Sequence, residues 1–123
     1  MTASTASCYS PVYLDVPRAI EQLGDAQALR NMLPMLLEML ERDVPRIADF
    51  LSGGDVRGAN ALLHSMKGCM PIFCVETLCE ELAQLEYVSK TAGITDVLPA
   101  YSVLAPKLEQ LKLDVSVFLM SAA

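Results

Sequence analysis

Residues 25–54 read DAQALRNMLPMLLEMLERDVPRIADFLSGG. Aliphatic residues recur here every three or four positions, as Leu29, Leu33, Leu36, Leu40, Val44, Ile47 and Leu51. This spacing puts the apolar side chains on one face and predicts a long amphipathic helix. We expect Asp25 to cap its start and residues 52–54 to end it. Pro34 and Pro45 are expected to bend the helix or to shift its start.

The same periodicity continues after Asp55 and predicts a second long helix from about Val56 to Ala92, stopped by Gly93. Its apolar face is Leu63, Met66, Met70, Cys74, Leu78, Leu82 and Leu85. A third long helix is expected after Thr95, with an uncertain start because of two prolines. Its apolar face is Leu104, Leu108, Leu111, Val115 and Leu119. Before all of these, Val16–Leu23 predicts a short helix.

No segment alternates with a period of two for long enough to predict a strand, so the apolar helix faces can only be buried against one another. The expected fold is all-α, an antiparallel four-helix bundle with a short additional N-terminal helix. Residues 1–13 are polar and without periodicity, and they are expected to form a flexible leader. Residues 14–123 are expected to form the helical bundle domain, because this length suits one domain.

The composition excludes several classes of function. Asp and Glu number 15 against 9 Lys and Arg, and the formal net charge is −6. Such a chain is not expected to bind nucleic acid, which needs clustered cations. No apolar stretch is long enough to span a membrane, and no signal peptide is recognisable. The four cysteines are not arranged as a disulfide framework, so we expect a reduced, cytoplasmic protein.

His64 is the only histidine of the chain. At about 100° per residue it lies about 130° from the apolar face of its helix, and Lys67 and Gly68 are its neighbours one turn on. A neutral imidazole in solvent is a nucleophile, and a nearby lysine can neutralise a phosphoryl group on the ring. Glycine inside a helix costs roughly 1 kcal/mol relative to alanine, and its missing side chain would let another protein's backbone approach.

Taken singly, each of these residues has a simpler explanation. A lone surface histidine is usually inert, Lys67 can be a solvated charge, and Gly68 can allow two helices to pack closely. One histidine and the absence of a CxxC pair argue against a metal site, and the cysteines are best read as small apolar residues. Only the joint pattern of His64, Lys67 and Gly68 indicates a function.

That pattern, in the run Ala61-Leu62-Leu63-His64-Ser65-Met66-Lys67-Gly68, resembles the motif of the histidine-containing phosphotransfer (HPt) family. The layout of residues 14–120 is also similar to that family, including Gly54-Asp55 before the histidine and the run from Leu78 to Glu86 after it. The resemblance implies that His64 accepts and donates the phosphoryl group. It also implies that Lys67 contacts this group and that Gly68 leaves room for the partner.

The outward face around His64 supplies the expected docking residues. They are Arg57, Asn60, Ala61, Pro71, Ile72 and Val75. The family often has small residues after the glycine and a second glycine ten positions past the histidine. In this sequence those positions hold Cys69, Met70, Pro71, Ile72, Phe73 and Cys74. We expect Pro71, Ile72 and Val75 to form an apolar docking patch.

The resemblance implies a relay in which a response-regulator receiver domain, or a hybrid histidine kinase, exchanges its aspartyl phosphate with His64. The chain shows no phosphate-binding loop and no carboxylate cluster for Mg²⁺, so it is expected to have no cofactor of its own, with Mg²⁺ on the partner receiver. It would be a monomeric phosphocarrier without autonomous kinase activity. Whether it counts as an enzyme is left open.

Three alternatives stay open. The chain could be the phosphoacceptor domain of a chemotaxis-type histidine kinase, which uses a similar run of His, Lys and Gly. It could be a helical binding module that docks a receiver or another signalling protein without carrying phosphate. It could also be a purely structural helical domain, which would leave the outward cluster of His64, Lys67 and Gly68 unexplained.

Overall fold

The structure, a computed structural model, describes residues 9–121. These residues form five α-helices and one 3₁₀ turn: α2 (Val16–Leu23), α3 (Ala26–Ser52), α4 (Val56–Cys69), η1 (Met70–Ile72), α5 (Glu76–Val88) and α6 (Ile94–Met120). The prediction of an all-α chain is therefore confirmed for the part that the structure describes. Residues 1–8 of the expected leader lie outside the described residues.

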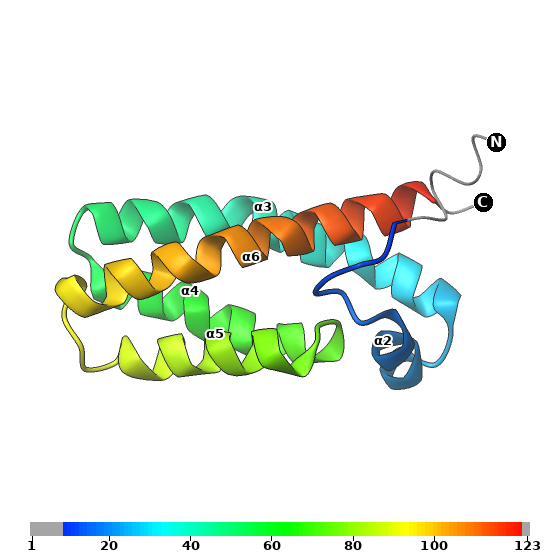
Figure 1. Ribbon diagram of the computed structural model, residues 1–123, viewed down its shortest axis with the longest axis horizontal. Coiled ribbons are helices and arrows are strands. Elements are labelled where there is room, and N and C mark those ends of the chain that lie inside the picture. Colours follow the sequence, from blue (N-terminus) through cyan, green and yellow to red (C-terminus); the bar gives the residue numbers. More distant parts are fainter. Residues whose placement is uncertain (1–8, 122–123) are drawn as a thin grey trace.

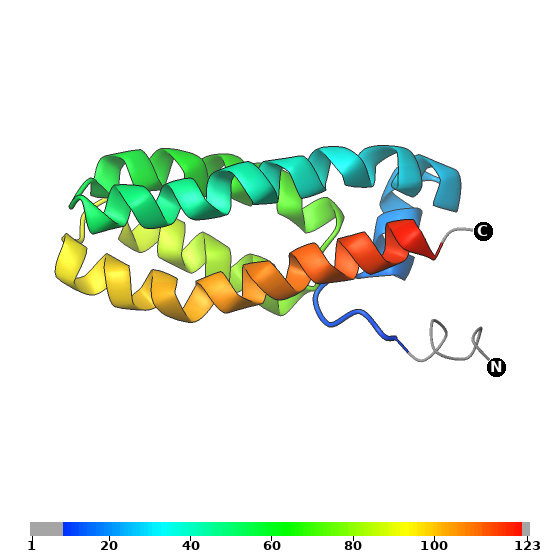
Figure 2. The ribbon, with the colours of Figure 1, turned by 90° about the horizontal axis from the view of Figure 1, so that it is seen from above.

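The five α-helices pack against one another (Figures 1 and 2). α3 and α6 have 27 residues each and lie side by side, which at 1.5 Å per residue makes each about 40 Å long. α4 and α5 are about half as long, so they cover only one end of this pair, where α4 contacts α3 and α5 contacts α6. The short helix α2 packs on α3 at the other end.

One continuous core holds the helices together. The apolar faces predicted for the three long helical segments are buried, except that Leu119 is only partly buried. The largest side chains that are fully buried are Leu29, Leu33, Leu40, Ile47, Leu51, Leu63, Met66, Met70, Leu78, Leu82, Leu104 and Leu108. Three carboxylates, Asp43, Glu86 and Asp114, are buried as well, and each has hydrogen-bonding partners.

The prediction of one continuous helix from Val56 to Ala92 is wrong. The chain leaves the α-helix after Cys69, makes the turn η1 and starts α5 only at Glu76. Pro71 has no N–H group to donate to the carbonyl four residues back, and its ring clashes there, so it favours an interruption. The apolar spacing passes through this break without a change, because the side chains on both sides still point into the same core.

An N-terminal segment pairs with the chain at this break. Leu14 forms an isolated β-bridge with Cys74, the Asp15 N–H donates to the Phe73 carbonyl at 2.8 Å, and the Val75 N–H donates to the Tyr13 carbonyl at 2.9 Å. These bonds satisfy backbone groups that a continuous helix would have paired internally. The residues just after η1 are thus held against this N-terminal segment.

Residues 9–14, most of them assigned to the leader, are fixed to α6 by the buried carboxylate of Asp114. Its Oδ2 accepts the backbone N–H groups of Val12, Tyr13 and Leu14 at 3.0, 2.7 and 3.1 Å. Its Oδ1 accepts the Tyr9 hydroxyl, and burial together with this carboxylate raises the pKa of Tyr9 to about 12. We call residues 9–15 the N-terminal strap.

Two other predicted boundaries differ from the structure, namely the end of α5 and the start of α6. α6 begins at Ile94, and Gly93 is its N-cap instead of the stop of the preceding helix, which ends at Val88.

Neither Pro34 nor Pro45 shifts the start of α3, because Asp25 caps it as predicted through a 2.8 Å bond from the Ala28 N–H. Tertiary packing on both sides of a proline can compensate for the lost hydrogen bond.

No helix within residues 9–121 is long and apolar enough to cross a membrane. Cys69, Cys74 and Cys79 are free thiols, and Cys8 lies outside the described residues. Because the chain breaks between α4 and α5, these three cysteines do not share one helix.

Candidate functional site

His64 lies in the middle of α4 with 67% of its side chain exposed. The helix is placed by its buried face, on which Leu63 and Met66 are fully enclosed, and by the Asp55 carboxylate, which caps it through the Gly58 N–H at 2.8 Å. Because helical neighbours are about 100° apart, this packing turns His64 outward, as the sequence predicted.

The Glu86 side chain on α5 contacts the His64 imidazole from the side of the protein core. Only 1% of its side chain is exposed, and its Oε2 lies 3.2 Å from His64 Nδ1. Its Oε1 accepts Lys67 Nζ at 3.1 Å, and Lys90 Nζ lies 3.9 Å from Oε2. A single buried carboxylate thus connects the histidine to the lysine that the motif pairs with it.

The charge of Glu86 is maintained by these partners. Burial alone would raise the pKa of the Glu86 carboxyl group, but the hydrogen bonds from Lys67 and His64, together with the charges of Lys67 and Lys90, lower it below its ordinary value. A buried carboxylate is stable only when it is paired in this way. Glu86 is therefore an acceptor for both of its neighbours.

The contact with Glu86 selects one form of the neutral imidazole. A carboxylate can only accept hydrogen bonds, so the neutral ring places its proton on Nδ1. The Nε2 atom then carries the lone pair, and it forms no hydrogen bond to the residues that the structure describes. In this form the ring presents Nε2 to solvent as a nucleophile, and the Glu86 carboxylate can stabilise positive charge that develops on the ring.

Gly68 has no structural reason to be a glycine. A Cβ atom added there would meet nothing within 4 Å, so the glycine is not required for two helices to pack closely. Its φ is not in the left-handed region, unlike that of Gly54 at 78°. The open space is on the exposed surface one turn from His64.

Asn60, predicted as a docking residue, is engaged within the protein. Its Nδ2 donates to Ser89 Oγ at 2.8 Å and to the Glu86 carbonyl at 3.1 Å, and it lies 3.4 Å from Glu86 Oε2. These bonds join α4 to the last turn of α5. Asn60 therefore fixes the two helices at the spacing that brings Glu86 under His64.

The remaining predicted docking residues fall into two groups. Arg57 and Ala61 are exposed on α4. The residues Pro71, Ile72 and Val75 lie in the segment between α4 and α5 and are half-buried. They do not continue the outward face of α4, because the helix on which that prediction rested ends at Cys69. The Pro71 carbonyl also accepts Arg18 Nε from α2 at 3.1 Å.

Glu86 was not predicted as a site residue, although the sequence holds a signal for it. It stands four residues after Leu82 and eight after Leu78, which puts it on the buried face of α5. A charged residue at an apolar position is rarely buried unless it is paired. Nothing in the sequence says that its partners come from α4, since this depends on how the two helices pack.

Glu86→Gln tests the ionised state of the carboxylate. The folded pKa of Glu86 lies below its unfolded value, so its stabilisation is present above about pH 4.3 and is lost as pH falls through the folded pKa. At pH 7 we expect Glu86→Gln to lower the free energy of unfolding by about 1.5–3 kcal/mol.

Urea unfolding of both proteins between pH 7 and pH 3 measures this difference. It should shrink towards zero at low pH, because a protonated carboxyl group and an amide are nearly isosteric. A difference that stays constant over the whole range would show that the charge of Glu86 does not contribute to stability.

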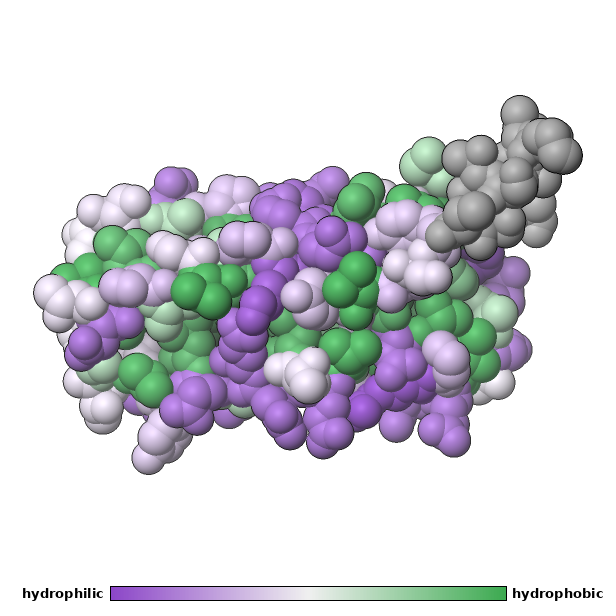
Figure 3. Space-filling model, viewed as in Figure 1, coloured by the Kyte–Doolittle hydropathy of each residue, from purple (hydrophilic) through white to green (hydrophobic). Residues whose placement is uncertain are grey.

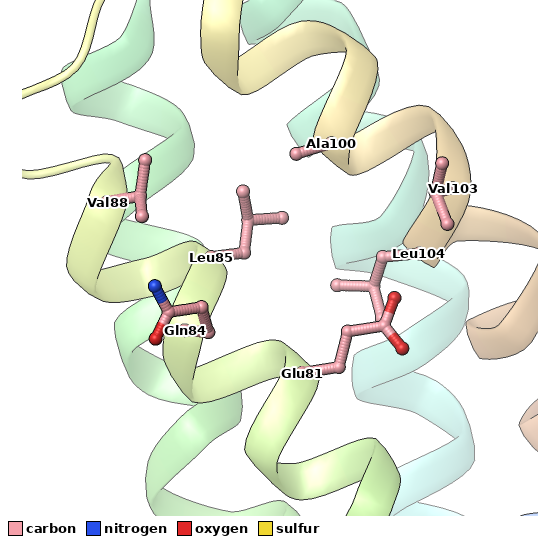
Figure 4. A pocket seen from close by; sticks show the side chains of 7 residues that line it. All are labelled: Glu81, Gln84, Leu85, Val88, Ala100, Val103 and Leu104. Atoms are coloured by element: carbon pink, nitrogen blue, oxygen red, sulfur yellow. The ribbon is translucent and has the colours of Figure 1, made fainter.

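One pocket lies away from His64. A groove of about 370 Å³ runs between α5 and α6 and is lined by Glu81, Gln84, Leu85, Val88, Ala100, Val103 and Leu104 (Figure 4). Apolar side chains also show on this face of the surface (Figure 3). The groove contains neither His64 nor its partners, and residues 9–121 contain no cluster of His, Cys, Asp and Glu that could hold a metal ion.

Comparison of the chain with known protein families, with curated proteins and with solved structures found no match.

Proposed function

We propose that the chain is a histidine phosphotransfer protein of a two-component phosphorelay. The observation that carries the proposal is the geometry of His64, whose Nδ1 is hydrogen bonded to a buried carboxylate while Nε2 is open to solvent. Lys67 beside it can supply positive charge, and Gly68 has no side chain that would obstruct the approach of a partner.

The reaction follows from these atoms. The lone pair of His64 Nε2 attacks the phosphorus of an aspartyl phosphate on a receiver domain. The N–P bond forms as the acyl O–P bond breaks, and the receiver's carboxylate leaves with the electron pair. The ring becomes positively charged, and the Nδ1–H bond to Glu86 stabilises this charge. The reverse reaction passes the phosphoryl group to a second receiver.

Lys67 has a double role in this proposal. One N–H of its ammonium group binds Glu86, and the other donors can reach a phosphoryl group on the neighbouring ring. Such a reaction depends mainly on positioning and on neutralising charge. Mg²⁺ and the acyl phosphate belong to the receiver, so the chain acts as a carrier and not as a kinase.

The fold and setting are part of the proposal. α3, α4, α5 and α6 would form an antiparallel four-helix bundle, with α2 as the additional N-terminal helix; the closed ring of contacts α3–α4–α5–α6–α3 supports this arrangement. We propose a monomer in the cytoplasm that meets response-regulator receivers or a hybrid histidine kinase.

Phosphoryl transfer from purified receivers tests the proposal. A panel of receivers is phosphorylated with radioactive acetyl phosphate, freed of small molecules and mixed with the full chain. We expect at least one receiver to label the chain with an acid-labile, base-stable phosphate that mass spectrometry maps to His64. Stable binding of a receiver without any labelling would contradict the proposal and favour a binding module. Labelling only by a nucleotide-dependent kinase domain would favour the phosphoacceptor domain of a chemotaxis-type kinase.

Gly68→Ala separates stability from docking. Alanine is the better helix former and meets no atom at this position, so we expect the free energy of unfolding to rise by about 0.5–1 kcal/mol while transfer from the receiver slows. The matched control is Gly58→Ala, whose Cβ would lie 2.8 Å from the Phe50 ring and should destabilise the protein. Urea unfolding and the transfer rate give both quantities. An unchanged transfer rate in Gly68→Ala would remove Gly68 from the docking surface.

A further inference from the structure

A second cleft opens one helical turn from His64, between the start of α4 and the segment after α5. It has a volume of about 290 Å³ and is lined by Val56, Arg57, Asn60, Ser89, Lys90, Thr91 and Ala92. Asn60, four residues before His64 on the same helix, borders this cleft and also bonds to Glu86. The cleft therefore adjoins the face of α4 and α5 that carries His64.

Two cations line the cleft, Arg57 from α4 and Lys90 from the segment after α5. Arg57 is exposed and takes part in none of the ion pairs found within residues 9–121. Lys90 is half exposed, and its ammonium group lies 3.9 Å from the buried Glu86, at the limit of an ion pair. Both therefore have donors left for another anion.

None of the residues that line the cleft is acidic. The sequence has no Asp or Glu between Val56 and Val75 or between Tyr87 and Thr95. Asp55 precedes α4, but its carboxylate caps the helix through the Gly58 N–H. Glu86 lies below the surface and is already paired. In a chain of net charge −6, this region is locally cationic.

We propose that this cleft binds an acidic side chain, Asp or Glu, on the surface of the protein that docks over His64. Its small volume suits one carboxylate side chain, and Arg57 can hold a carboxylate with two parallel hydrogen bonds. Opposite charges on two partners fix their register and raise the rate of encounter. This inference rests on the proposed function, because it specifies the chemistry of the docking partner. The contact with Arg57 and Lys90 lies outside the motif of His64, Lys67 and Gly68.

Arg57→Ala, Lys90→Ala and the double variant test the contact with the receiver that labels the chain. Each single variant is expected to raise the receiver concentration at half-maximal transfer by about 3–10-fold at low salt, and Arg57→Ala, which makes no contact with Glu86, should leave the saturating rate unchanged. The control is Ala48→Glu, at an exposed position on α3, which makes the same change in net charge and should shift this concentration less than twofold. Equal values for Arg57→Ala and Ala48→Glu would overturn the proposal.

A second measurement needs no phosphoryl transfer. The ¹⁵N-labelled full chain is titrated at low salt with the peptide acetyl-Glu-Glu-Glu-Glu-amide and followed by NMR. The shifts should be confined to residues 56–60 and 89–92 and should disappear in the double variant. Shifts elsewhere, or shifts that persist in the double variant, would overturn the acidic-ligand assignment. Failure of every receiver to label the wild type would instead contradict the proposed function, while the peptide titration still decides what the cleft binds.

Discussion

His64→Gln is expected to abolish phosphoryl transfer from a receiver, with labelling reduced at least about a thousand-fold to background. His64 is the only imidazole in the chain, so no other ring nitrogen can take the phosphoryl group. Glutamine is the informative replacement because its amide N–H can still donate to Glu86, which keeps the buried carboxylate partnered. The exposed position of the side chain should limit the change in the free energy of unfolding to about 0.5 kcal/mol.

The measurement is the initial rate of label transfer at equal protein concentration, with circular dichroism and urea unfolding as checks of the fold. Ser65→Ala is the matched control, since it removes an exposed hydroxyl group next to His64 and should leave labelling unchanged. If His64→Gln were labelled as well as the wild type, the phosphorelay assignment would be wrong. Loss of labelling in Ser65→Ala would point to a phosphoserine instead.

Asp114→Ala is expected to cause the largest loss of stability, about 3 kcal/mol, with a fall in Tm of about 10 °C. This one side chain accepts three backbone N–H groups of the N-terminal strap as well as the Tyr9 hydroxyl and Gln110 Nε2. Without it the strap must either leave those donors unpaired or detach from α6. The strap in turn holds the break between α4 and α5, so we expect its loss to loosen that junction.

Hydrogen exchange locates the effect. The amides of Val12, Tyr13 and Leu14 should exchange faster in Asp114→Ala, together with those of Asp15 and Val75, which bond across the strap. Glu109→Ala on the same helix is the control, because its carboxylate is exposed and, within residues 9–121, pairs only with Lys112. It should change stability by less than about 1 kcal/mol. Equal stability of the two variants would show that Asp114 does not anchor the strap.

The sequence determined the helical nature of the chain and most of the core. Leucines at intervals of three and four residues define the buried face of α3, and Asp25 caps this helix as expected. Local signals sufficed here because periodicity and capping act within one or two turns. The outward position of His64, with Lys67 one turn away, follows from the same periodicity.

Only the tertiary structure decided where the second helical segment breaks. Pro71 interrupts a helix, while Pro34 and Pro45 do not, although all three stand in apolar helical patterns. The difference is that the residues after Pro71 find backbone partners in the strap, which comes from far away in the sequence. Proline lowers the free-energy cost of interrupting a helix, but contacts between distant segments determine whether the interruption forms.

The candidate site divides in the same way. Its surface residues, His64, Lys67 and Gly68, come from one helix and could be read from their spacing. Its buried residue, Glu86, and the bonds from Asn60 that set the distance between the helices depend on how α5 lies against α4. A helical pattern specifies which side chains share a face, but not which side chain of another helix lies opposite. For that physical reason the sequence predicted the histidine, and only the packing of α5 on α4 supplied the carboxylate that orients it.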